Sequence, residues 1–267
     1  MTETHDIYAL PQLYDLAFAY RDVPAECDFM VASYTNLRGA PPQSCLELAC
    51  GPGEHCRILA ARGLRAVGID IADAMLDYAR TLPGGDLPRI AWRRADMRAF
   101  TLPAAVDLAF CLVDSLSHLL TLEDLLAHLS AVAAAVRPRG LYIIEQSHPR
   151  DAFPFGDVAH PPEWTMEDES GSLTVHVQWG QPDDPFDFTS QIAQLHVTLT
   201  AIEAGEGVQQ HRATVPSRLW LAGEMEAAIR ASGQWRIVER FGAMDRATPW
   251  QSEPPAWRMV TILEREE

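Results

Sequence analysis

The chain of 267 residues contains no lysine, so its 21 basic side chains are all arginine. This absence excludes chemistry that needs a lysine amine, such as a Schiff base. Acidic residues outnumber the basic ones, 37 against 21, and the formal net charge is −16. Binding to a phosphate backbone depends on a positive surface, so this charge argues against a nucleic-acid partner and favours a small or neutral substrate.

Long apolar runs and cysteine motifs are also missing. No stretch approaches the ~18 apolar residues of a membrane-spanning helix, and the start MTETHDIYAL has neither the basic nor the apolar region of a secretion signal. We therefore expect a soluble, cytoplasmic protein without a membrane partner. The five cysteines are odd in number and include no C-x-x-C pair, so neither a disulfide framework nor a metal site is expected.

One stretch, residues 45–70, has the pattern of a βαβ unit with its ligand-binding end marked. A buried strand leads into a tight turn at residues 51–53, a helix over 54–62 and a second strand over 66–69, which Asp70 follows. Glycines in such a turn let the backbone approach a ligand, and the helix N-terminus presents unpaired N–H groups. An acid ~20 residues later can accept hydrogen bonds from ribose hydroxyls. The unit predicts a nucleoside-containing cofactor.

Two details of this unit narrow the choice of cofactor. A dinucleotide fingerprint needs a third glycine where the helix packs on the strand, and that position holds Cys56. Glu47 also lies inside the first strand, where negative charge would not help to bind a pyrophosphate. Both details favour a cationic ligand over a nicotinamide dinucleotide.

Four motifs, the first of which begins at residue 47, resemble those of a known family. The chain carries E-L-A-C-G-P-G at 47–53, G-I-D at 68–70, A-D-M-R at 95–98 and R-P-R-G at 137–140. These motifs, in this order and spacing, resemble those of class I S-adenosylmethionine-dependent methyltransferases of the small-molecule type, such as amino-sugar and natural-product N-methyltransferases. One departure is Ala49, where many members of the family have glycine.

The resemblance implies a Rossmann-like, doubly wound α/β fold around a seven-stranded mixed sheet, with S-adenosyl-L-methionine as cofactor. It implies that Asp96 hydrogen-bonds the adenine amino group and that the Met97 N–H meets an adenine ring nitrogen. It further implies an N-terminal lid over the methionine end, with Tyr14 and Tyr20 near that end. The expected cofactor-binding residues are Tyr14, Tyr20, Glu47, Ala49, Cys50, Gly51, Gly53, Asp70, Ile71, Met75, Asp96, Met97, Arg98 and Leu112.

A different pattern interrupts this resemblance after the fifth expected strand. Alternating apolar and polar residues over 173–179, 195–201 and 208–215 predict antiparallel strands inserted into a core that is complete without them. An apolar face left exposed on this sheet would favour a homodimer. The expected parts are an N-terminal helical lid (1–40), a cofactor-binding core (41–150), an inserted antiparallel subdomain (151–215) and a C-terminal helix and strand pair that completes the core (216–267).

Two histidines, His118 and His148, are the catalytic candidates. Each follows the carboxyl end of an expected strand, 106–113 and 141–146, where open α/β sheets bind their ligands. Methyl transfer from a sulfonium needs in-line alignment and exclusion of water, and a base helps when the nucleophile arrives protonated. Histidine has a suitable pKa for that base.

These patterns favour an enzyme that transfers a methyl group from S-adenosylmethionine to N or O of a small molecule. The insert would form a wall over the acceptor. A nicotinamide dehydrogenase is disfavoured by the two details of the turn. A protein that binds S-adenosylmethionine without catalysis, as a sensor or interaction partner, remains the alternative.

Overall fold

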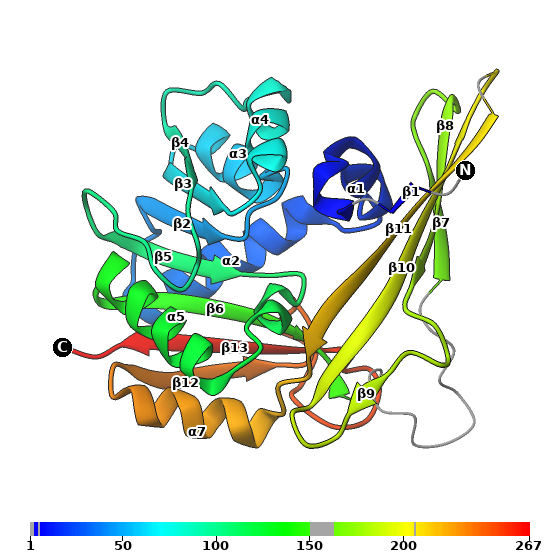
Figure 1. Cartoon of the computed structure of the whole chain (residues 1–267). Coiled ribbons are helices and arrows are strands. Elements are labelled where there is room, and N and C mark those ends of the chain that lie inside the picture. Colours follow the sequence, from blue (N-terminus) through cyan, green and yellow to red (C-terminus); the bar gives the residue numbers. More distant parts are fainter. Residues whose placement is uncertain (1–2, 5, 150–162, 206) are drawn as a thin grey trace.

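Two β-sheets organise residues 3–4, 6–149, 163–205 and 207–267, which are the residues that the computed structural model describes (Figure 1). The larger sheet has seven strands in the order β12-β13-β6-β5-β2-β3-β4. The smaller sheet has the order β1-β11-β10-β8-β7, with β9 paired to β10. The loop expected at residues 151–162 lies outside the described residues.

The larger sheet confirms the expected doubly wound, mixed architecture. Strands β2 to β6 are parallel, and β13 is antiparallel to both β6 and β12. The chain builds β2, β3 and β4 in one direction and then returns to build β5 and β6 in the other, so the topological switch point lies between β2 and β5. The strands are β2 Ser44–Leu48, β3 Arg65–Asp70, β4 Ile90–Arg94, β5 Val106–Cys111, β6 Val136–Ser147, β12 Trp235–Phe241 and β13 Arg258–Arg265.

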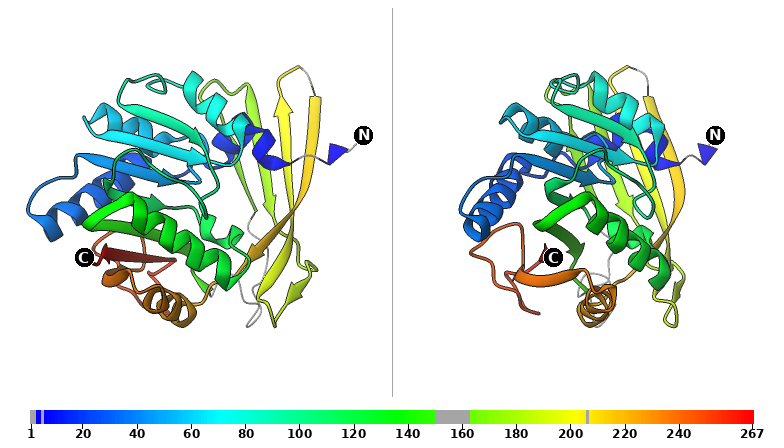
Figure 2. Two further views of the ribbon diagram at one scale, coloured as in Figure 1. Left: turned by 60° about the vertical axis from the view of Figure 1, so that its left-hand side comes forward. Right: turned by 90° about the vertical axis from the view of Figure 1, so that its left-hand side faces the viewer.

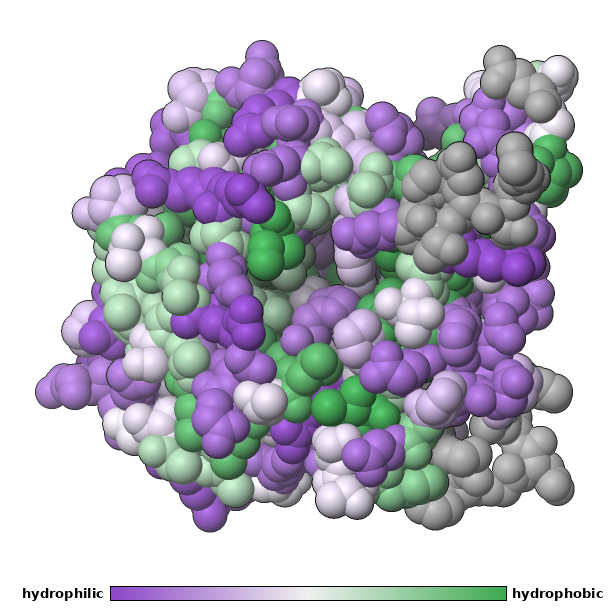
Figure 3. Space-filling view, in the orientation of Figure 1, coloured by the Kyte–Doolittle hydropathy of each residue, from purple (hydrophilic) through white to green (hydrophobic). Residues whose placement is uncertain are grey.

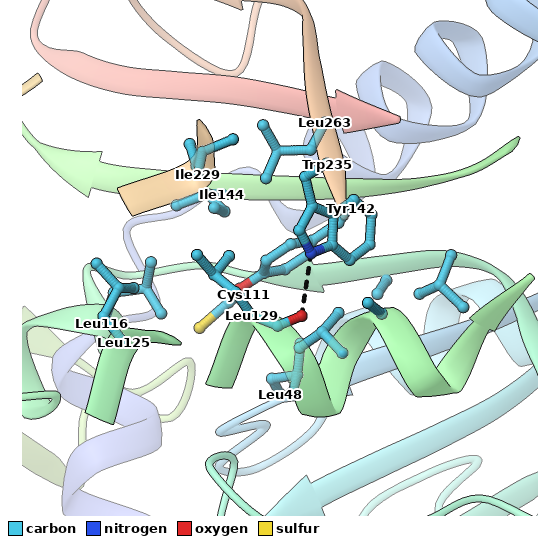
Figure 4. Close-up of a cluster of buried hydrophobic side chains, with 14 of the residues drawn as sticks. Leu48, Cys111, Leu116, Leu125, Leu129, Tyr142, Ile144, Ile229, Trp235 and Leu263 are labelled. Carbon is cyan, nitrogen blue, oxygen red and sulfur yellow. Dashed lines mark hydrogen bonds between the residues drawn. The ribbon is translucent and has the colours of Figure 1, made fainter. Parts of the chain in front are cut away.

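Helices cover both faces of this sheet. On one face, apolar side chains of α5 (Leu122–Ala135) and α7 (Ala222–Ser232) pack against the strands. Figure 4 shows part of this cluster, in which the Trp235 indole Nε1 donates a hydrogen bond of 3.0 Å to the carbonyl of Leu129. On the other face, α2 (Val23–Arg38) and α3 (Glu54–Ala61) form a second cluster. The helix α4 (Asp73–Thr81) packs on β3 and β4.

The starts of α5 and α4 differ in whether a side chain caps the helix. Thr121 caps α5, because its side chain accepts a hydrogen bond from the Asp124 N–H at 3.0 Å. Asp73, at the start of α4, is of a residue type that commonly caps helices, but it is the first helical residue and the cap position is Ala72. The Ala72 N–H instead donates to the Asp70 carboxylate at 2.8 Å, so the acid at the end of β3 supplies an acceptor at this helix start.

The smaller sheet is the antiparallel insert that the alternating pattern predicts. Val175, Val177, Val197 and Leu199 are buried on one face. On the opposite face, His176 pairs with Glu163. The strands are β7 Glu163–Glu167, β8 Leu173–Trp179, β9 Phe186–Asp187, β10 Ile192–Glu203 and β11 Gly207–Arg218.

The N-terminal segment covers the apolar face of the insert. Ile7 in η1 (Ile7–Ala9) and Ala17 in α1 (Pro11–Ala17) are fully buried in the same cluster as the insert's valines. The short strand β1 (Glu3–Thr4) also pairs in parallel with β11, which the sequence did not predict. Helix α1 therefore lies between the insert and the core (Figure 2), whereas α2 packs on the core. The apolar face that we expected to favour a homodimer is thus covered within the chain itself.

Two further features of the described residues concern the lengths of the helices and the state of the cysteines. No helix among them is long and apolar enough to cross a membrane. All five cysteines are buried and free.

Candidate active site

The turn after β2 lies at the switch point of the larger sheet, where open α/β sheets bind ligands. Three of its residues, Ala49, Gly51 and Gly53, have left-handed backbones, with φ of 51°, 50° and 67°. The Cys50 N–H donates to the Ile69 carbonyl at 2.9 Å, which fixes the turn on β3. A side chain built on Gly51 would meet only the Tyr14 ring edge, at 4.0 Å, so the backbone here faces open space.

Gly53 is small for a reason that the sequence did not reveal. We expected the cofactor to exclude a side chain at this position, but a Cβ on Gly53 would lie 2.2 Å from the Trp92 indole. A Cβ on Gly68 would lie 2.5 Å from the same ring. The indole Nε1 is fixed by a 2.8 Å hydrogen bond to the Gly85 carbonyl. Trp92 therefore requires both glycines, because its ring fills the space beside the turn.

Asp70 connects the turn with the start of α4. Its carboxylate accepts hydrogen bonds of 2.8 Å from the Gly51 N–H and of 2.8 Å from the Ala72 N–H. Burial raises the pKa of this carboxyl, although the backbone hydrogen bonds oppose the shift. The next side chain, Ile71, is 63% exposed. A carboxylate with free lone pairs beside an uncovered apolar side chain fits a ribose and its attached base.

Glu47 lies beneath the turn. It is 5% exposed, and its oxygens meet His55 Nδ1 and the Cys56 N–H, each at 3.1 Å. His55 Nε2 contacts Glu26 at 2.8 Å. Burial disfavours the imidazolium, but the charges and hydrogen bonds of Glu47 and Glu26 outweigh it and raise the pKa of His55 to about 9. The charge of Glu47 is therefore compensated by His55, and it is weaker evidence for a cationic ligand than the sequence suggested.

Asp96, expected to contact adenine, is engaged by a neighbouring arginine. Its carboxylate accepts hydrogen bonds from the Arg98 side chain, the shortest being 2.6 Å, and from the Arg98 N–H at 2.8 Å. Arg98 also reaches Asp124 on α5 at 2.7 Å. Hydrogen bonds from Arg98 lower the pKa of Asp96 despite its partial burial. The loop after β4 is thereby fastened to α5.

His128 fastens the same loop from below, and we did not identify it from the sequence. It is fully buried, and its ring contacts the Met97 carbonyl at 2.9 Å and the Tyr142 hydroxyl at 2.7 Å. Burial lowers its pKa to about 4, so the ring is neutral. A histidine within the apolar stripe of α5 gives no signal of this role, because its partners lie on distant segments.

Three further expected residues support the site from within the core. Met75 in α4 is 1% exposed, Leu112 after β5 is 4% exposed and Cys50 in the turn is 6% exposed. Burial raises the pKa of the Cys50 thiol well above its usual range, so this cysteine is not a thiolate nucleophile.

The N-terminal segment meets the turn through Tyr14. Burial, and then the charge of Asp70, raise the pKa of the Tyr14 phenol. The residues after the two tyrosines fasten the segment to the core: Asp15 accepts a 3.1 Å hydrogen bond from the Tyr78 hydroxyl of α4, and Arg21 pairs with Glu145 of β6 at 2.8 Å. Tyr20 is 46% exposed. The structure thus brings Tyr14 to the turn and leaves Tyr20 at the surface of the N-terminal segment.

The two candidate histidines lie beyond neighbouring strands but in different surroundings. His118 ends η2 (Ser115–His118), and its Nε2 is 2.9 Å from the Tyr8 hydroxyl. Its side chain is solvent-exposed, and desolvation by the neighbouring protein lowers its pKa. His148 is buried, and its Nε2 donates to the Gln251 carbonyl at 3.1 Å.

The segment that follows β5 has an unusual backbone. Val113 and Asp114 are both left-handed, with φ of 55° and 56°. The Val113 N–H donates to the Glu145 carboxylate at 2.9 Å. Glu145 is 1% exposed and pairs with Arg21 at 2.8 Å and with Arg258 at 3.2 Å. A buried ion cluster therefore holds the strained end of this strand.

An aromatic cluster lies between the lid and the insert. The Phe18 ring meets Trp164 and Trp179 edge to face, at 5.8 Å and 5.5 Å, and Trp164 also meets Tyr20 at 6.0 Å. Figure 3 shows that the surface is hollowed between the core and the insert. Within the described ranges, no group of three or more His, Cys, Asp or Glu side chains could hold a metal ion.

Comparisons with known proteins agree with this geometry. A family model described as a methyltransferase domain matches residues 45–140. A dTDP-3-amino-3,4,6-trideoxy-alpha-D-glucopyranose N,N-dimethyltransferase of Streptomyces venezuelae is 25% identical over 83% of this chain and 88% of its own. A dTDP-4-amino-2,3,4,6-tetradeoxy-D-glucose N,N-dimethyltransferase of Saccharopolyspora spinosa is 27% identical over 70% of this chain and 80% of its own.

Solved structures share the whole fold, including the insert. The S-adenosylmethionine-bound amino pentose methyltransferase CalS10 from Micromonospora echinaspora has a TM-score of 0.70 at 19% identity and covers 99% of both chains. An S-adenosylmethionine-dependent methyltransferase from Clostridium acetobutylicum has a TM-score of 0.74 at 17% identity, over 96% of this chain and 97% of that one.

The fold and the site together define a class I methyltransferase. This chain is an S-adenosylmethionine-dependent methyltransferase of that class.

Proposed function

We propose that this enzyme methylates the amino nitrogen of a small sugar, with a nucleotide-linked amino sugar as the class of acceptor. One observation carries the proposal: the similarity to two amino-sugar N,N-dimethyltransferases extends over 70% and 83% of the chain, well beyond the domain at residues 45–140. The reaction takes place in the cytoplasm, and the formal charge of −16 supports the absence of a nucleic-acid partner.

The residues around the switch point fit the parts of S-adenosylmethionine. Asp70 accepts from the ribose hydroxyls through the lone pairs that Gly51 and Ala72 leave free, and Ile71 packs on the adenine. The Met97 N–H and Asp96 face the adenine edge. When bound, the cofactor supplies a sulfonium methyl group for in-line displacement.

The remaining expected residues shape the turn and close it. Gly51 and Ala49 bring the backbone close to the methionine part, and Tyr14 covers it from the lid. Glu47, Cys50 and Gly53 hold the turn from beneath, as their contacts with His55, Ile69 and Trp92 indicate. The remaining residues that we expect to bind the cofactor are Tyr20, Met75, Arg98 and Leu112.

The insert and the lid together exclude water from the acceptor. The aromatic cluster of Phe18, Trp164 and Trp179 offers the apolar wall that a deoxygenated sugar needs. His118 and Tyr8, whose side chains are 2.9 Å apart, contact the acceptor. His148 positions the end of β6 through its bond to Gln251.

Two measurements test this function. Calorimetric titration with S-adenosylmethionine, S-adenosylhomocysteine and NAD should show tight binding of the first two only. Mass spectrometry of a panel of dTDP-linked amino sugars should then show the gain of one or two methyl groups. Transfer to hydroxyl acceptors alone would refute the N-methyltransferase, and cofactor binding without transfer to any panel member would favour the catalytically silent alternative.

The role of Asp70 can be tested with Asp70→Asn. The variant keeps an oxygen acceptor but loses the charge-assisted hydrogen bonds to the ribose, each worth ~1.5–3 kcal/mol. We expect S-adenosylmethionine to bind ~10–100-fold more weakly in calorimetry. Asp73→Asn, at an exposed carboxylate of the same helix start, is the control and should bind normally. Equal affinities of the two variants would remove Asp70 from the cofactor site.

A further inference from the structure

Asp114 is a carboxylate at the switch point to which the proposed function assigns no role. It follows β5, the strand next to β2 on the acceptor side of the sheet, and it begins the short helix that ends at His118. Ligands of open α/β sheets lie outside the carboxyl ends of the strands at this point. Asp114 is therefore placed between the cofactor turn and the hollow under the insert.

The backbone at Asp114 is strained, and the fold maintains the strain. Left-handed conformations of non-glycine residues cost ~1–3 kcal/mol each, and a β-branched valine rarely adopts one. Here Val113 and Asp114 adopt it in succession, held by the 2.9 Å hydrogen bond from the Val113 N–H to Glu145. Such strain clusters at functional sites, where it aims a side chain that relaxed backbone would direct elsewhere.

The charges around Asp114 leave its carboxylate without an ionic partner in the described part of the chain. Glu145 on β6 and Arg258 on β13 face it, and Ser147 supplies hydrogen bonds. Arg258 is paired with Glu145 at 3.2 Å, as is Arg21 at 2.8 Å. No ion pair within 4.0 Å joins Asp114 to a described arginine or histidine. A partly exposed acid among arginines that are already paired can receive a cation from outside.

We propose that Asp114 binds the acceptor amine as its ammonium ion and takes the proton that the nitrogen must lose before methyl transfer. The proposal rests on the proposed N-methyltransferase function. One N–H bond breaks and one O–H bond forms on Asp114, which frees the nitrogen lone pair. That pair forms the C–N bond as the C–S bond breaks and its electrons pass to sulfur. The proton then leaves Asp114 for solvent, so each methyl transfer releases one proton.

Asp114 suits this role better than either histidine. Burial raises its pKa to about 6, which places it near neutrality, where a general base is most effective. His118 has a lowered pKa and its Nε2 is occupied by Tyr8. His148 is buried, with its Nε2 on the Gln251 carbonyl. Neither histidine carries negative charge to attract an ammonium ion.

The test compares wild type with Asp114→Asn, which has the same shape without the charge, using the amino sugar that wild type methylates best. We expect kcat/KM to fall ~10²-fold or more, and the acidic limb of its pH profile near pH 6 to disappear. Acceptor binding in the presence of S-adenosylhomocysteine should weaken several-fold in calorimetry, while the affinity for S-adenosylmethionine should change little. Asp77→Asn, an exposed acid on α4, is the control and should match wild type.

The outcomes separate this proposal from the proposed function. If wild type methylates amines and Asp114→Asn keeps both its rate and its acidic limb, Asp114 is not the base. If wild type methylates hydroxyl groups only, both proposals fail.

A second measurement uses wild type alone, in case Asp114→Asn does not fold. Acceptor affinity in the presence of S-adenosylhomocysteine should rise between pH 5 and pH 7, because Glu145, with its lowered pKa, and Arg258 keep their charges over this range while Asp114 ionises. A flat dependence would overturn the proposal.

Discussion

At the scale of single residues, we expect that replacing Ala49 with glycine makes the protein more stable, which is unusual for a glycine substitution. Its φ of 51° is strained for a residue with a Cβ but free of strain for glycine. We expect Ala49→Gly to raise the free energy of unfolding by ~1 kcal/mol, partly offset by the greater freedom of the unfolded chain. Ala133→Gly, inside α5, should instead lower it by ~1 kcal/mol. Urea denaturation of both variants checks the opposite signs, and a loss of stability in Ala49→Gly would contradict the assignment.

Residue types and spacing predicted which side chains border the turn, but not what fills the space beside them. The positions of Gly51 and Asp70 follow from the βαβ pattern. That Trp92 excludes a side chain at Gly53 does not, since the contact joins segments whose approach only the fold determines. The proposed role of Asp114 could not be predicted from the sequence for the same reason, since it depends on a strained backbone and on neighbours from β6 and β13.

At the scale of elements, the lid and the insert form one unit. Val177 in β8 is fully buried in the cluster that contains Ile7 and Ala17, and α1 packs on β7 and β8. We first expected the core to be complete without the insert. The structure instead links the two, because α1 packs on the insert and also carries Tyr14 to the cofactor turn. Removing the insert would uncover α1 and loosen Tyr14.

A substitution in this cluster tests the coupling. Val177→Asp places an unpaired charge among apolar side chains, which is strongly unfavourable, so α1 should detach. We expect faster amide hydrogen exchange in α1 and roughly 10-fold weaker S-adenosylmethionine binding, about the loss of one hydrogen bond to a charged group. Gln178→Asp, on the opposite face of the same strand, is the control. If Val177→Asp bound the cofactor as tightly as the control does, the lid would be independent of the insert.

Most elements followed from periodicity and end signals, because these are local. The alternation at 173–179 and the cap at Thr121 are both present in the structure. The pairing of β1 with β11 could not be predicted, since two residues carry no periodicity and the partner strand is remote. Helix α4 starts at Asp73 itself rather than after it, so this aspartate does not act as the cap, and the cap position is Ala72, whose N–H donates to Asp70.

At the scale of the whole molecule, one buried ion chain joins the lid, the core and the C-terminal strands. Its contacts run from 2.8 Å to 3.2 Å, and positive and negative members alternate. A buried ion pair loses stability sharply when one partner is removed or neutralised. The protonation state of His55, the one histidine in this series of ion pairs, should therefore affect the stability of the entire fold. The members are Arg258, Glu145, Arg21, Glu26, His55 and Glu47.

Two buried histidines contribute opposite pH dependences to the stability, one on each side of pH 6.5. The pKa of His55 is raised to about 9, so its contribution is complete below pH 6.5 and is lost as the pH rises toward 9. The pKa of His128 is lowered to about 4, so its contribution is complete above pH 6.5 and is lost as the pH falls toward 4. At 1.36 kcal/mol per pKa unit, a change of about 2.5 in either pKa corresponds to ~3 kcal/mol.

The alkaline limb is unusually easy to assign in this chain. No lysine titrates, and the buried thiols, whose pKa values are raised, reduce stability only above about pH 8.5, where thiols of the unfolded chain ionise. Urea denaturation between pH 6.5 and 8.5 should therefore report His55. We expect His55→Gln to be less stable than wild type at pH 6.5 and to lose little more by pH 8.5. His128→Gln should keep the alkaline limb and should lose the part of the acidic limb that His128 contributes between pH 6.5 and pH 4. An alkaline limb of unchanged depth in His55→Gln would show that the ion chain does not depend on this imidazolium.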